Sequence, residues 1–157
     1  MACEVKLIRQ AQFADTDMAG IVHFTNFFRY MEETEHAFYR SLGFSVDMEC
    51  AEKSLGVGWP RVKAECNYIH PVRFEDTVEV HLLIKEIKTK TISFVFVFRK
   101  ADGGREVEVA RGGMTVICVT RDKDTGKMKA ATIPQEIRSK LSVAPASLLK
   151  SGDGNAN

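Results

Sequence analysis

Two aspartates stand two residues apart in the segment Phe13–Phe24, close to the N-terminus. A carboxylate can attack an electrophilic carbon as a nucleophile, or it can activate water as a general base. The segment leads directly into a stretch with helical periodicity, and the N–H groups at a helix N-terminus can stabilise an oxyanion. Gly20 would let the backbone approach a substrate closely. Asp15 and Asp17 are therefore candidate catalytic residues, although an Asp-rich turn that only bonds its own backbone has the same pattern.

The sequence contains no recognisable metal-ligand pattern. Its cysteines are widely spaced, with no Cys-x-x-Cys pair and no histidine at zinc-ligand spacing. The four are Cys3, Cys50, Cys66 and Cys118. The Asp-x-Asp pair has no partner carboxylate at a spacing that suggests a cation site. We expect no metal site, and we expect the thiols to be reduced.

Composition limits the class of protein. The chain has 157 residues, 45% of them hydrophobic and 27% charged, which fits one globular domain. Lys and Arg number 22 and Asp and Glu 21, so the net charge of +1 argues against a broadly basic nucleic-acid binder. We find no signal peptide and no apolar run of membrane-spanning length, which favours the cytoplasm.

The elements that must position the two aspartates follow from hydrophobic periodicity. One face of a helix is predicted by the spacing of Phe24, Phe27, Phe28, Met31, Phe38 and Leu42. Thr25 or Asn26 can cap its start, and Gly43 can supply the left-handed residue that ends it. A helix of about 17 residues at 1.5 Å per residue is long enough to cross a small sheet.

Period-two alternation predicts strands before and after this helix. The predicted strands cover residues 5–13, 62–68, 78–84, 92–98 and 107–119. The strand at 92–98 has little polar surface on either face, so it should be central in the sheet or covered on both sides. A hairpin is expected at Asp102-Gly103-Gly104, a close approach or bulge at Gly112-Gly113, and a short helix from Pro134 to Leu141. The fold class is α+β, a curved antiparallel sheet wrapped around one helix, with one domain at 1–141 and a flexible tail at 142–157.

Phe13–Phe24, continued by Asn26–Glu32, resembles the signature of the hotdog-fold acyl-CoA thioesterases, and most closely the 4-hydroxybenzoyl-CoA thioesterase branch. The similarity continues through Gly43-Phe44, Val57–Pro60, Ile84–Thr91 and Lys127–Pro134. The resemblance implies a hotdog fold. It also implies hydrolysis of an aromatic or short to medium-chain acyl-CoA to free acid and CoA. CoA would enter as part of the substrate, with no cofactor.

The resemblance also implies roles for residues of the Asp-rich segment. Asp17 matches the family's catalytic carboxylate, acting as nucleophile or general base, and the backbone N–H of Phe24 matches the oxyanion donor. His23 stands where the hydroxybenzoyl branch has an aromatic residue, so it either assists Asp17 or packs at the helix start.

Substrate-binding residues are implied in the same way. Glu32 matches an acidic position of the acyl pocket, where the alternative is a solvated charge on the helix, and Trp59 can line the acyl tunnel. The positions that hold the CoA phosphates are matched by Lys85, Lys88, Lys90, Lys127 and Lys129. Lysines suit phosphates as point charges, although a charge run is usually a solvated strand end.

Two other functions are compatible with the sequence. Hotdog folds include hydratases and dehydratases that use a histidine with a carboxylate, and His23 keeps this enoyl-CoA chemistry open. A non-catalytic acyl-binding module is the third possibility, because fold does not determine function. The resemblance further implies a homodimer joined edge to edge that assembles into a homotetramer, and open strand edges give an independent reason to expect pairing.

Overall fold

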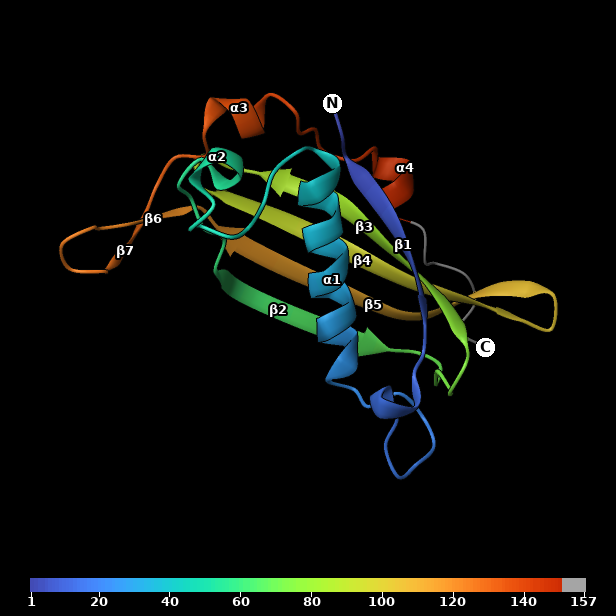
Figure 1. The fold of residues 1–157 in the computed structure, drawn as a ribbon. Coiled ribbons are helices and arrows are strands. Elements are labelled where there is room, and N and C mark those ends of the chain that lie inside the picture. Colours follow the sequence, from blue (N-terminus) through green and yellow to red (C-terminus); the bar gives the residue numbers. More distant parts are fainter. Residues whose placement is uncertain (151–157) are drawn as a thin grey trace.

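In the computed structural model, which describes residues 1–150, five strands form one antiparallel sheet in the order β1-β3-β4-β5-β2 (Figure 1). The strands are β1 (Glu4–Gln10), β2 (Arg61–Tyr68), β3 (Thr77–Ile87), β4 (Thr91–Asp102) and β5 (Arg105–Ile117). Each overlaps a strand that hydrophobic alternation predicts. The β4–β5 hairpin turns at Gly103 and Gly104, both with positive φ, as expected. The predicted α+β class is confirmed.

The long helix α1 (Asn26–Ser41) lies across one face of the sheet (Figure 1). Gly43, with a φ of 84°, follows its end as predicted. The start differs from the prediction, because Thr25 precedes the helix without capping it through its side chain. The Thr25 hydroxyl instead pairs with His23 Nδ1 at 2.7 Å.

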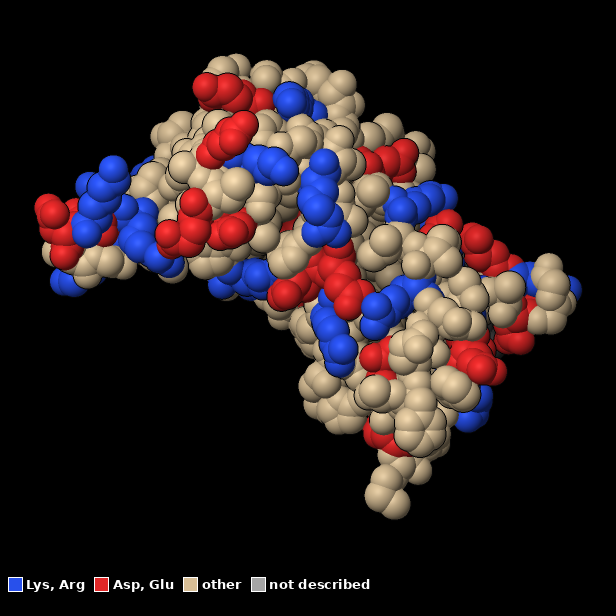
Figure 2. Space-filling view, in the orientation of Figure 1, with Lys and Arg blue, Asp and Glu red and all other residues tan. Residues whose placement is uncertain are grey.

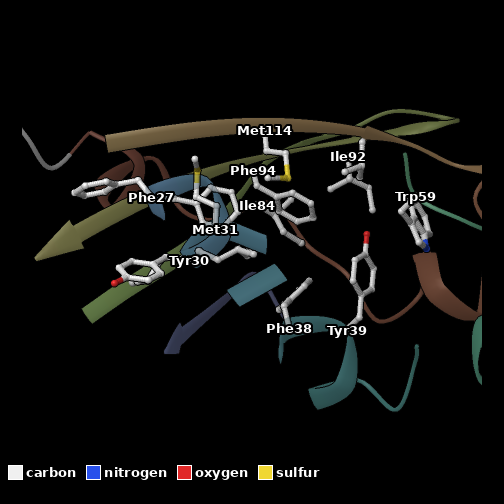
Figure 3. Packing of buried hydrophobic residues seen from close by; sticks show 14 of the residues in the cluster. Phe27, Tyr30, Met31, Phe38, Tyr39, Trp59, Ile84, Ile92, Phe94 and Met114 are labelled. Carbon is white, nitrogen blue, oxygen red and sulfur yellow. The ribbon is translucent and has the colours of Figure 1, made fainter. Parts of the chain in front are cut away.

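Aromatic side chains fill the layer between α1 and the sheet (Figure 3). Phe27 packs edge-on against Phe98, with ring centroids 5.3 Å apart, and further along the helix Phe38 packs against Phe94 at 6.2 Å. Gly112 of β5 allows the close approach that the sequence predicts. A Cβ at this position would collide with Met31 Sδ and lie 3.2 Å from the Glu65 carbonyl oxygen. The helix therefore sits directly on the centre of the sheet.

Part of the far face of the sheet is covered by the C-terminal segment, residues 142–150, which contains α4 (Ala146–Leu149). The Ser142 N–H donates to the Ala2 carbonyl and the Ala144 N–H to the Ile84 carbonyl. Ala144, Leu148 and Leu149 pack against Leu83 and Val97, which are fully buried. Residues 142–150, which we predicted to be a flexible tail, thus make hydrogen bonds and apolar contacts with the sheet, while residues 151–157 lie outside the described residues. β4 is the central strand of the sheet, as its sequence allows, and this segment covers Val97 on its far face.

The connections contain short elements. They are the 3-10 turn η1 (Phe13–Asp15), α2 (Ala51–Ser54), β6 (Val119–Arg121), β7 (Met128–Ala130) and α3 (Gln135–Arg138). The predicted strand 107–119 is interrupted, because the Cys118 N–H bonds to the Lys90 carbonyl and the chain then continues into the separate β6–β7 hairpin. The predicted helix at 134–141 is shorter in the structure. Within residues 1–150, no helix has the length and apolar character needed to cross a membrane.

Candidate active site

The structure distinguishes the two candidate aspartates. Asp15 is buried, with 2% of its surface exposed, and its carboxylate is engaged by the Gln12 N–H at 2.9 Å and the Tyr30 hydroxyl at 2.7 Å. Asp17 is half-buried and lines a pocket with a volume of about 490 Å³. Only Asp17 is therefore placed to meet a substrate.

A tight turn presents the Asp17 carboxylate. Asp17 Oδ1 accepts a hydrogen bond from the Ala19 N–H at 2.9 Å, and the Asp17 carbonyl accepts one from the Gly20 N–H. The φ of Gly20 is 78°, in the left-handed region that glycine adopts without strain. Within residues 1–150, Asp17 Oδ2 has no hydrogen-bond partner, so one carboxylate oxygen stays available for chemistry.

The Phe24 N–H lies at the end of the same loop. The groups on both sides of it are held, because the His23 N–H donates to the Asp15 carbonyl at 2.8 Å and the Tyr68 hydroxyl donates to the Phe24 carbonyl at 3.0 Å. Among the described residues, the Phe24 N–H itself has no acceptor. A backbone N–H held in this way can bind a developing oxyanion.

Asp17 and Phe24 line the same pocket, between the loop and the end of β2. The other lining residues are Ile21, Val22, Phe27, Tyr68, Ile69, His70, Pro71 and Val72. Most of these are apolar or aromatic, and in the space-filling view this lower end of the molecule carries few charges (Figure 2). The pocket thus combines a carboxylate, an open N–H and an apolar wall.

His23 is turned toward the helix start. Its Nδ1 lies 2.7 Å from the Thr25 hydroxyl and accepts the Thr25 N–H at 3.3 Å. A ring nitrogen that accepts a backbone N–H carries no proton, so the neutral ring has its proton on Nε2. The ring lies beside that of Phe24, with centroids 4.6 Å apart. This geometry fits packing at the helix start, and assistance to Asp17 stays a prediction.

Glu32 belongs to a charged cluster further along α1. The Arg61 guanidinium lies 3.4 Å from the Glu32 carboxylate and 2.6 Å from that of Glu35. Glu35 has 1% of its surface exposed, and this burial raises its pKa to about 7, although the neighbouring Arg61 lowers it. Glu32 is therefore paired rather than freely solvated, and it lies outside the Asp17 pocket. Glu35 could not be predicted from local sequence, because its partner Arg61 is 26 residues away.

This cluster predicts a pH effect on stability. The pKa of Glu35 is raised in the folded state. Between about pH 4.5 and 7, the folded protein therefore still holds a proton on Glu35 that the unfolded chain has already released. The Glu35 contribution to the free energy of unfolding should therefore fall as pH rises through this range. We expect Glu35→Gln to remove that fall, measured by urea unfolding at several pH values. An identical pH dependence in the variant would contradict the assignment.

Trp59 does not line the Asp17 pocket of its own chain. It is buried and stacks on Tyr39, with ring centroids 5.4 Å apart. Tyr39 lies twelve residues after Phe27 on α1, which corresponds to about 18 Å along the helix axis. Figure 3 shows Phe27 and Trp59 at opposite ends of the core. Trp59 thus lies away from Asp17 of the same chain, and its role in substrate binding stays a prediction.

The predicted phosphate-binding lysines gather at this far end. Lys85 lies near the end of β3, Lys88 and Lys90 lie in the β3–β4 turn, and Lys127 and Lys129 lie in the β6–β7 hairpin. All five side chains are exposed. The two segments are adjacent, because the Cys118 N–H just before β6 donates to the Lys90 carbonyl at 2.7 Å. Figure 1 places this hairpin well away from the loop that holds Asp17. The base of the β6–β7 hairpin thus lies beside the β3–β4 turn, and neither segment lies beside Asp17 of the same chain.

No group of three or more His, Cys, Asp or Glu residues within 1–150 is arranged to hold a metal ion. The site residues that sequence reasoning missed are Tyr68, Ile69 and His70, at the end of β2. Only the His70-Pro71 break marked this place in the sequence, and it marked a strand end rather than a pocket.

Comparison with known proteins gives consistent matches. The family model described as the thioesterase-like superfamily matches residues 11–141. A protein of Aquifex aeolicus (strain VF5), named only as an esterase, is 33% identical over 82% of this chain and 91% of its own length. The 4-hydroxybenzoyl-CoA thioesterase of Pseudomonas sp. (strain CBS-3) is 24% identical over 87% of this chain and 96% of its own. Among solved structures, a gentisyl-coenzyme A thioesterase matches with a TM-score of 0.71 and 30% identity, covering 85% of this chain and 99% of that one.

Proposed function

The chain belongs to the thioesterase-like superfamily, and we propose that it hydrolyses acyl-CoA thioesters with Asp17 as the reacting carboxylate. The predicted hotdog fold and the predicted class of enzyme, a thioester hydrolase, are confirmed by these relatives. The observation that carries the proposal for Asp17 is its place in one pocket with the Phe24 N–H.

The proposed reaction uses the two groups together. The Phe24 N–H binds the thioester carbonyl oxygen and stabilises the negative charge that forms on it. Asp17 either attacks the carbonyl carbon, giving an acyl anhydride that water then hydrolyses, or takes a proton from the water that attacks. In both routes the carbon–sulfur bond breaks and CoA leaves as a thiolate. Because thiolate is a good leaving group, we propose that no cofactor is needed and that CoA enters only as part of the substrate.

The acyl group that we propose is aromatic or short to medium in length. Two relatives are named for aromatic acyl groups, 4-hydroxybenzoyl and gentisyl. The pocket beside Asp17 supports this choice, because Phe24, Phe27 and Tyr68 give it an aromatic wall. Such a wall favours an apolar or aromatic group over a charged one.

The site supports hydrolysis over enoyl-CoA hydration. A hydratase of the kind considered above would need His23 as an acid or base beside a carboxylate. The Nδ1 of His23 is engaged by Thr25, and His23 is not among the residues that line the Asp17 pocket. Asp17 with the Phe24 N–H is sufficient for thioester cleavage without a histidine.

We also propose that the working enzyme is a homodimer whose sites combine two chains. The lysines that would bind the CoA phosphates lie far from Asp17 of their own chain, so a second chain must bring them to it. Strand β2 is an edge of the sheet, its residues are mostly exposed, and Val62 and Tyr68 leave 61% and 46% of their surface uncovered. An exposed edge of this kind favours pairing with the same edge of a second copy.

Two finer predictions remain proposals. The homodimer would assemble further into a homotetramer, as the family resemblance implies. The enzyme would act in the cytoplasm, where its four cysteines, all free in the structure, would stay reduced.

The proposal is tested by incubating the protein with a panel of aromatic and straight-chain acyl-CoAs and measuring the release of free CoA thiol. We expect turnover of at least one aromatic member. The absence of thiol release from every acyl-CoA would overturn the proposed substrate class. Hydration of an enoyl-CoA without thiol release would favour the lyase, and binding without turnover would favour the non-catalytic module.

A further inference from the structure

We propose that Asp15 is a positioning residue, which fixes the distance between the Asp17 carboxylate and the Phe24 N–H. The inference rests on the proposed function, in which these two groups act on one thioester. Asp15 does not line the pocket that holds Asp17 and Phe24, and its effect on the reaction is exerted through the loop that it holds.

The side chain of Asp15 joins the loop to α1. Asp15 Oδ2 accepts hydrogen bonds from the Gln12 N–H and from the Tyr30 hydroxyl, and both donors are close. The guanidinium groups of Arg9 and Arg29 lie 3.7 and 3.9 Å from the carboxylate oxygens. Hydrogen bonds to an ionised and buried carboxylate are among the stronger ones in proteins. The loop therefore has a rigid attachment to the helix at this point.

The ionised form of Asp15 is the one this environment favours. Burial alone raises the pKa of a carboxyl group, but the Gln12 N–H, the Tyr30 hydroxyl and the two arginines together bring the pKa of Asp15 below its usual value. A turn residue that only bonded its own backbone would need neither this burial nor these partners from α1 and β1.

The backbone of Asp15 closes the loop at its base. Its carbonyl oxygen accepts the His23 N–H at 2.8 Å and the Asn26 side-chain amide at 2.7 Å. Further along the loop, the Asp17 N–H donates to the Ile21 carbonyl at 2.9 Å. The Asp15 backbone is thus hydrogen-bonded to His23, the residue directly before Phe24, and Asp15 precedes Asp17 by two residues. A shift of Asp15 must therefore change the separation of the two reacting groups.

The Tyr30 hydroxyl allows a clean test, because α1 carries a matched control. Tyr30→Phe removes the donor to Asp15 and keeps the ring that packs under Arg9. Tyr39→Phe removes another buried hydroxyl from the same helix, and that hydroxyl has no hydrogen-bond partner within residues 1–150. We expect Tyr30→Phe to lower kcat about tenfold with KM unchanged, because a small misplacement of reacting groups mainly affects the transition state. We expect Tyr39→Phe to leave kcat unchanged.

Substitution of Asp15 itself supplies a rescue experiment. Asp15→Asn retains one oxygen that can accept a hydrogen bond, whereas Asp15→Ala retains none. The Asn variant should therefore recover part of the kcat that the Ala variant loses. In the Asp17→Asn background, Tyr30→Phe should cause no further loss, because its effect depends on Asp17. Thermal unfolding of each variant verifies that kcat is measured on folded protein, and Tyr30→Phe carries the test if Asp15→Ala does not fold.

The outcomes separate this inference from the proposed function. If Asp17→Asn keeps the wild-type rate, the proposed role of Asp17 is wrong and the role of Asp15 falls with it. If Asp17→Asn abolishes turnover but Tyr30→Phe lowers only the melting temperature and leaves kcat unchanged, Asp15 is purely structural and the inference alone is overturned.

Discussion

Asp17→Asn should lower kcat about 1,000-fold while leaving the fold and the binding of acyl-CoA intact. The amide keeps an oxygen that can accept the Ala19 N–H, so the turn at Gly20 should survive the substitution. It can neither attack a thioester carbonyl effectively nor take a proton from water. Thiol release under saturating substrate gives kcat, and calorimetry with the variant gives the affinity for an acyl-CoA that it no longer cleaves.

Asp102→Asn is the matched control for this experiment. Asp102 is exposed in the β4–β5 turn, and the substitution makes the same chemical change away from the pocket. Its kcat and KM should equal those of the wild type. A normal rate in Asp17→Asn would show that another group performs the reaction, and the proposed mechanism would have to be abandoned.

The elements of the fold were predictable from the sequence because burial imposes a period on each of them. Alternation in β4 places Phe94, Phe96 and Phe98 on one face, where all three are buried. The spacing of Phe27 and Phe38 likewise predicts the face of α1 that meets them. Local periodicity records only which face is buried, and it does not identify the segment that covers it. This is why the central position of β4 was predictable and the packing of residues 142–150 over Val97 was not.

The site was only partly predictable, because local sequence does not record which distant residues contact a side chain. Asp15 and Asp17 are equivalent in the sequence, two acidic residues of one loop, and the family resemblance alone separates them. In the structure the difference comes from Tyr30 and Arg9, which reach Asp15 from α1 and β1. Glu35 could not be identified as a buried acid from the sequence, because its ion-pair partner Arg61 belongs to a different element. Contacts between distant parts of the chain leave no local pattern.

The predicted phosphate-binding lysines show a second limit of prediction from sequence. Their association with the catalytic residues came from the resemblance alone, and the structure places them at the other end of α1 from Asp17. A sequence does not say whether two parts of a site come from one chain or from two. The single-chain structure, in which the lysines do not lie beside Asp17, leads to the specific expectation that a second copy brings them to it.

Mixing two inactive variants should therefore restore activity. One variant carries Asp17→Asn and the other replaces Lys88, Lys90, Lys127 and Lys129 by alanine. At acyl-CoA concentrations below KM each should be nearly inactive alone, the first for lack of the carboxylate and the second for lack of phosphate binding. In a two-fold symmetric dimer, half of the randomly formed dimers are hybrids, and each hybrid has one site with both wild-type parts. After co-refolding of equal amounts, we expect about one quarter of the wild-type rate per chain.

The appropriate control is a partner that lacks both parts. A chain with Asp17→Asn and all four lysine substitutions can form the same hybrids with the Asp17→Asn chain, yet it supplies no carboxylate to any site. That mixture should stay inactive, which separates true complementation from a general benefit of mixing. If the first mixture also stays inactive although exchange of chains is demonstrated by mass spectrometry of tagged copies, Asp17 and the lysines do not meet across two chains. That result would overturn the proposed site that combines two chains.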